Sequence, residues 1–89
     1  MNQAIGDPDE LDAFAHSLRS YLDHINEATG QLNQQFGALG ETWQDAKRAQ
    51  FEEQFQELLR QLAAFDASAT EQIPHLRSMA TKLRDYLQS

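Results

Sequence analysis

The chain has 89 residues, so it forms a single domain (1–89), and a domain of this size buries only roughly 60–65% of the surface that its unfolded chain exposes. It contains no cysteine, which excludes disulfides and thiolate metal sites. Its net charge is −7, without a basic stripe, so it lacks the cationic surface that nucleic-acid binding requires. We expect a partner protein to cover part of the remaining apolar surface.

Membrane and targeting signals are sparse. The apolar runs are a few residues long, far below the roughly 20 residues of a membrane-spanning helix, so no stable membrane insertion is expected. Residues 1–8 combine neither a basic segment nor an apolar one, and this predicts no classical signal peptide. The expected location is therefore the cytoplasm, or the outside of the cell after leaderless secretion.

A first helix is predicted over about residues 8–37. Asp7 can cap it, Pro8 suits its first position, and Glu10 follows three residues after the cap. Steps of three and four then mark one apolar helix face, at Leu11, Phe14, Leu18, Tyr21, Leu22, Ile25, Ala28, Leu32, Phe36 and Leu39.

The turn is predicted at residues 38–42, where Gly37 or Gly40 can provide a left-handed helix end. Thr42 is expected to cap a second helix, with Asp45 reaching back toward it. Trp43 is expected to pack across this closed end of the hairpin, and it can at the same time belong to a recognition surface.

The second helix is predicted over about residues 43–88, with a kink or break near Pro74 because proline removes a backbone donor. Counted at 1.5 Å per residue, the first helix would end opposite about residue 72. Residues 75–88 would then project as a tail, and Arg77 would lie near the acidic first turn of the first helix.

The fold class is therefore all-α, a long antiparallel helix-turn-helix hairpin. Both apolar stripes are wider than one two-helix contact needs, which predicts that two hairpins dimerise into a four-helix bundle. The stripe expected to form the core and dimer contacts includes Leu18, Tyr21, Leu22, Ile25, Phe51, Phe55, Leu58, Leu59 and Leu62.

The run from Leu39 to Phe51 places its tryptophan, Trp43, directly after a small-residue turn and an aromatic residue eight positions later. Together with the length and the two helical stripes, this run resembles the turn region of the WXG100 (ESAT-6-like) family, whose members are two-helix hairpins with W-x-G at the turn. The tripeptide here is W-Q-D, with Asp45 in the place of the glycine, so the turn motif consists of Trp43 and Asp45 in a divergent member.

The resemblance implies a non-enzymatic helical interaction protein, a homodimer or a heterodimer with a similar small helical protein, that serves type VII secretion as substrate or escort. Many exported members carry Y-x-x-x-[DE] after the second helix. Only three residues follow Tyr86 here, so a partner would have to supply that signal. The alternative is an intracellular helical adaptor or regulatory bundle that is not exported. A membrane-active effector is disfavoured by the acidic surface.

No cofactor, metal or catalytic site is predicted. His16 and His24 are eight residues apart, two helical turns, which is too far to chelate one ion from the same helix. The chain has no Glu-x-x-His pair, no phosphate-binding loop and no nucleophile–base arrangement.

Overall fold

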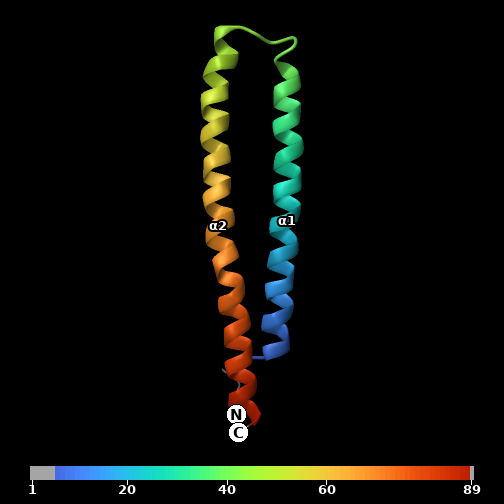
Figure 1. Cartoon of the computed structure of the whole chain (residues 1–89), viewed down its shortest axis with the longest axis vertical. Helices are drawn as coiled ribbons and strands as arrows, with labels where there is room; N and C mark the ends of the chain where they lie inside the picture. Colours follow the sequence, from blue (N-terminus) through green and yellow to red (C-terminus); the bar gives the residue numbers. More distant parts are fainter. Residues whose placement is uncertain (1–5, 89) are drawn as a thin grey trace.

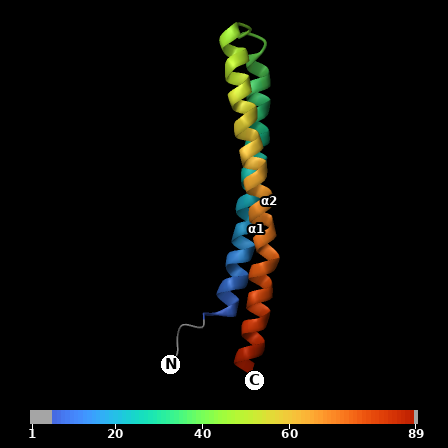
Figure 2. The same ribbon diagram turned by 90° about the vertical axis from the view of Figure 1, so that its left-hand side faces the viewer.

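The computed structural model describes residues 6–88, which form two long helices joined by a short loop. Helix α1 runs from Pro8 to Leu39 and helix α2 from Ala46 to Gln88. The two lie side by side and antiparallel in a rod of 67 × 19 × 17 Å (Figures 1 and 2). At 1.5 Å per residue, α2 by itself is about 65 Å long, so it spans nearly the whole molecule. The predicted all-α hairpin is confirmed.

Helix α1 begins as its sequence predicts. Asp7 is extended (φ −113°, ψ 117°), and its side chain accepts a hydrogen bond of 2.9 Å from the Asp9 amide. Pro8 occupies the first turn, where a missing amide hydrogen costs nothing, and the acidic groups of Asp9 and Glu10 complement the helix dipole.

The C-terminal end of α1 differs from the expected left-handed cap. Gly40 keeps a right-handed conformation, with φ −61° and ψ −18°, and its amide bonds the carbonyl of Gly37. The chain then tightens over one more turn, in which the amides of Thr42 and Trp43 both bond the carbonyl of Leu39. These bonds satisfy the last carbonyls of the helix without a residue at positive φ.

The two helices meet along one narrow line of side chains, which we call the seam. Its core comprises Ala15, Leu22 and Ile73, with Leu18, Ala69 and Leu76 packed against them. Ala15 and Ala80 are fully buried, and their small side chains allow close approach of the helices away from the turn. Leu22 is the largest side chain in the described part of the chain that is completely buried.

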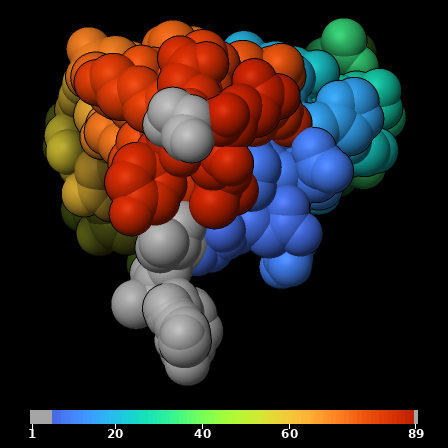
Figure 3. Space-filling view, turned by 90° about the horizontal axis from the view of Figure 1, so that it is seen from below, coloured from blue at the N-terminus to red at the C-terminus, as the bar shows by residue number. Residues whose placement is uncertain are grey.

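Arg84 joins the two helices at the end of the hairpin away from the turn. Its guanidinium lies 2.8 Å from a carboxylate oxygen of Asp9 and 2.7 Å from one of Asp12, and these hydrogen bonds raise the pKa of Arg84 above its ordinary value. Figure 3 shows the last turns of α2 against the start of α1 at this end.

The expectation that Arg77 faces the first turn of α1, with residues 75–88 as a tail, is therefore wrong. The paired region reaches Arg84, because Ala80 is buried in the seam and Arg84 contacts the first turns of α1. In Figure 1 the start of α2 stands slightly beyond the end of α1, since residues 40–45 carry the chain past that end. This offset shifts every residue of α2 toward the turn.

Helix α2 is continuous across Pro74, without the break that the sequence allowed for. Pro74 lies on the exposed side of the helix, so water can hydrate the carbonyl that loses its backbone donor. Ile73 and Ala80, on either side, are buried against α1 and hold the helix in line.

Replacement of Leu22 by Ala should lower the free energy of unfolding by about 2–5 kcal/mol, because the fully buried side chain leaves a cavity. Chemical denaturation followed by circular dichroism measures this. The matched control is Leu87→Ala, whose side chain is 54% exposed and should change stability little. Equal losses in the two variants would refute the seam as described.

Candidate functional site: an apolar face and its turn

Ten large hydrophobic side chains of the described chain are each between 45% and 64% exposed, and the helical spacing of nine of them, all except Leu87, places these nine along one side of the seam. On α2 they recur at multiples of seven residues, and on α1 they begin with Phe14 and Tyr21, each next to a buried seam residue. Because the seam also repeats every seven residues, the exposed stripe keeps a constant position beside it. We call this set the apolar face: Phe14, Tyr21, Leu32, Leu39, Phe51, Leu58, Phe65, Met79 and Tyr86.

The apolar face is hollowed at the turn end of the hairpin. A groove of about 450 Å³ lies there between the two helices, and it brings the α1 and α2 parts of the face together. It is almost entirely apolar and is lined by Leu32, Gln35, Phe36, Leu39, Phe51, Phe55 and Leu58.

Aromatic rings form the floor and one wall of this groove. The ring centroids of Phe36 and Phe55 are 4.9 Å apart, and Phe51 lies 5.7 Å from Phe36 and 6.1 Å from Phe55. Trp43 is half-buried and extends the cluster, with its ring 6.3 Å from that of Phe51. Such offset and tilted ring pairs are the favourable geometries for aromatic packing, so the cluster stabilises the turn.

Asp45, the residue in the third motif position, caps α2. Its carboxylate accepts hydrogen bonds from the amides of Lys47 (3.0 Å) and Arg48 (3.1 Å), which would otherwise be unpaired at the start of a helix. Thr42, which the sequence favoured as the cap, instead directs its hydroxyl toward the Leu39 carbonyl at 3.5 Å. The later start of α2, at Ala46, moves the cap from Thr42 to Asp45.

Arg48, near the start of α2, contacts both helices at the turn. The sequence analysis did not predict this role for Arg48. Its guanidinium stands 4.7 Å from the ring centroid of Phe36 and 3.4 Å from the Glu52 carboxylate. It lies directly over Gly40, where a Cβ atom would come within 2.9 Å of its Nη2. The absence of a side chain at Gly40 therefore makes room for the cation–π contact with Phe36.

Acidic groups are absent from the edge of the apolar face on α2. The positions that flank the stripe there carry two lysines, one histidine and three neutral residues, namely Lys47, Gln54, Gln61, Ser68, His75 and Lys82. The negative charge of the chain therefore lies mainly away from this edge, which keeps charge repulsion low beside the stripe.

The nine residues predicted as a single stripe divide between the seam and the apolar face. Leu22 and Phe55 are buried, Leu18, Ile25, Leu59 and Leu62 are half-buried, and Tyr21, Phe51 and Leu58 are exposed. Phe14, Phe65, Met79 and Tyr86 were not among these nine residues, although their seven-residue spacing with Tyr21, Phe51 and Leu58 was a usable signal.

Other kinds of site find no support in the described residues 6–88. No group of three or more His, Cys, Asp or Glu side chains is placed to hold a metal ion there. Neither helix of this part carries an apolar stretch long enough to cross a membrane. His24, one of the histidines considered above, has its Nδ1 2.7 Å from the Ser20 carbonyl of its own helix.

The chain is thus a two-helix hairpin with an exposed apolar face along its length. The sequence matches the model of the WXG100 family, described as proteins of 100 residues with WXG, over residues 5–88. The chain therefore belongs to the WXG100 family, a family of non-enzymatic, ESAT-6-like, secretion-associated helical proteins that commonly form dimers. Comparisons with curated proteins and with solved structures give no match.

Substitution of Asp45 by Ala should lower the free energy of unfolding by about 1 kcal/mol, because two amides lose their acceptor. Asp45→Gly, which restores the W-x-G tripeptide, should cost only a few tenths of a kcal/mol, since glycine leaves the amides open to water. Thermal unfolding compares the two. A larger loss for Gly than for Ala would show that Asp45 does not act as the cap.

Proposed function

We propose that this protein is a non-enzymatic helical interaction protein whose apolar face pairs with a second helical hairpin, identical or related, to form a four-helix bundle. In that paired form it acts as a substrate or escort of the type VII secretion machinery. Membership of the WXG100 family supports the link to secretion, and the apolar face supports the pairing.

The area of the apolar face carries this proposal. Nine large side chains, each exposing about half of roughly 200 Å², leave about 900 Å² uncovered. One partner in a stable protein–protein interface contributes about 800 Å², so the face is as large as an interface and larger than the patches typical of monomers. It also runs along nearly the whole hairpin, from Phe14 and Tyr86 at one end to Leu39 and Phe51 at the other.

An intracellular adaptor that is never exported is the second candidate, because it would use the same face. The two candidates differ in where the protein accumulates. A tagged chain should appear in the culture supernatant of a host with a type VII system, and it should remain in the cells when the secretion ATPase is deleted. Retention in the cells with an active ATPase, and with the partner hairpin present, would favour the adaptor.

The role of the apolar face in secretion can be tested by adding one negative charge on either side of the hairpin. Leu58→Glu places a carboxylate in the apolar face and should reduce export at least about tenfold, since burial of an unpaired charge opposes pairing. Gln56→Glu adds the same charge at an exposed position off the apolar face and should leave export unchanged. Equal export of the two variants would contradict a role for the face.

A further inference from the structure

We infer that the groove at the turn end of the apolar face binds a free long-chain carboxylate, a fatty acid anion such as dodecanoate. The alkyl chain lies in the groove and the carboxylate lies at Lys47. This ligand site goes beyond the proposed function, because it is built by one hairpin and does not require the apolar face to pair. Its basis is the shape of the groove, the neutral residues around it and the position of a single lysine.

The groove has the size and the lining that an alkyl chain needs. Its volume of about 450 Å³ falls within the range of about 300–1,000 Å³ that is typical of small-molecule sites. Gln35 is the one polar side chain among the residues that line it. The helix rises about 16 Å from Lys47 to Leu58, at 1.5 Å per residue. An extended dodecanoate has about this length, so it can reach from the lysine to the far end of the groove.

The rim of the groove is uncharged except at Lys47. The rows of side chains next to the lining on α1 and α2 are otherwise neutral, and they comprise Ala28, Gln31, Gln35, Ala38, Gln54 and Gln61. Lys47 continues the α2 row at the turn end, one helical turn before Phe51. None of the 14 acidic residues of the chain lies in these rows, so a carboxylate at this end of the groove meets a cation.

The ammonium group of Lys47 is available to a ligand. Lys47 takes part in none of the ion pairs among the residues that the structure describes. The neighbouring carboxylate of Asp45 instead accepts the backbone amides of Lys47 and Arg48. Glu57, one row further out on α2, lies 2.7 Å from Arg60. The apolar groove therefore supplies affinity, and Lys47 sets the direction in which the acid lies.

Trp43 provides a direct test, because it is the only tryptophan of the chain and its ring lies 6.3 Å from that of Phe51, in the groove wall. Bromine quenches tryptophan fluorescence on contact. Dodecanoate brominated beside its carboxylate should quench Trp43 more strongly than dodecanoate brominated at the far end of its chain. Both are titrated into the full chain below the concentration at which they form micelles. Absence of saturable quenching would overturn the site, and the opposite order would overturn the orientation.

The location of the alkyl chain is tested by two matched substitutions on the α2 stripe. Leu58 lines the groove and Met79 lies outside it, although their side chains are almost equally exposed, at 46% and 49%. Leu58→Gln should raise the dissociation constant of dodecanoate at least about tenfold, because apolar contact is lost, whereas Met79→Gln should not. Circular dichroism verifies that both variants remain helical. Equal weakening would show that the acid spreads along the whole apolar face, against the site.

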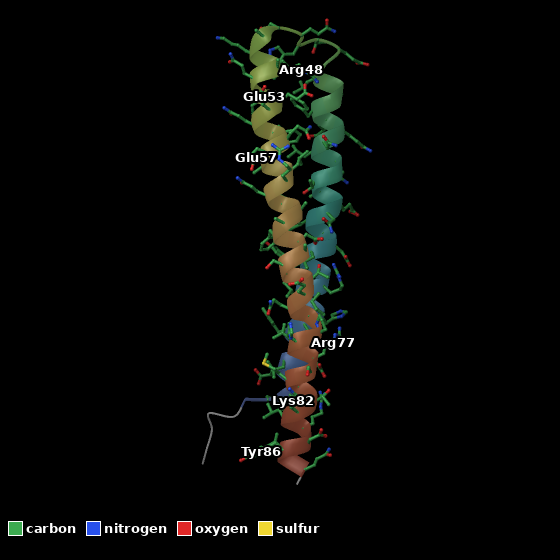
Figure 4. The ribbon with its side chains drawn as sticks, turned by 60° about the vertical axis from the view of Figure 1, so that its left-hand side comes forward. Arg48, Glu53, Glu57, Arg77, Lys82 and Tyr86 are labelled. Atoms are coloured by element: carbon green, nitrogen blue, oxygen red, sulfur yellow. The ribbon has the colours of Figure 1, made fainter. Side chains whose placement is uncertain are left out.

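The role of Lys47 is tested by the same change at the two ends of the stripe. Lys47→Gln should weaken dodecanoate binding at least about threefold, because the carboxylate loses its cation. Lys82→Gln removes the same charge near the opposite end of α2 (Figure 4) and should leave binding unchanged. Dodecanol, which has no charge, should bind both variants and the natural chain equally. Equal effects of the two lysine variants on dodecanoate would overturn Lys47 as the carboxylate site. Failure of export or pairing would contradict the proposed function and leave these results unaffected.

Discussion

The structure depends on the fact that two helices in contact share only one seam. Each helix can bury only one narrow line of side chains, spaced by three and four residues, against the other, and here that line includes Ala15, Leu22, Ile73 and Ala80. Apolar residues next to this line, such as Tyr21 beside Leu22, stay about half-exposed because the other helix does not reach far enough to cover them. The apolar face is therefore a direct geometric consequence of wide stripes on a two-helix scaffold, and folding alone cannot remove it.

The two ends of the hairpin are stabilised by different chemistry. Near the turn, the aromatic rings of Phe36, Phe51 and Phe55 pack together and line a groove between the helices. At the opposite end, alanines allow close contact, and Arg84 joins α2 to α1 through two carboxylates.

The turn shows how the family motif can change without loss of the fold. In W-x-G the third position is glycine, and here Asp45 takes that position and supplies a side-chain acceptor for the first amides of α2. A glycine is still needed nearby, because Arg48 lies over Gly40 to reach Phe36. The ring of Trp43, the tryptophan of the motif, lies 6.3 Å from that of Phe51 and so belongs to the aromatic cluster at the turn.

The sequence by itself determined the helical hairpin, its turn, its family and the excess of apolar residues, because helical periodicity, glycine placement and the tryptophan position are local signals. Only the tertiary structure decided the register, which changed the partner of the first turn from Arg77 to Arg84, and the division of one broad stripe into a seam and an exposed face. Both depend on how far residues 40–45 carry the chain before α2 begins, and on which side of each stripe meets the other helix. A displacement of one turn, about 5 Å, reassigns every contact between the helices, and no local pattern encodes it.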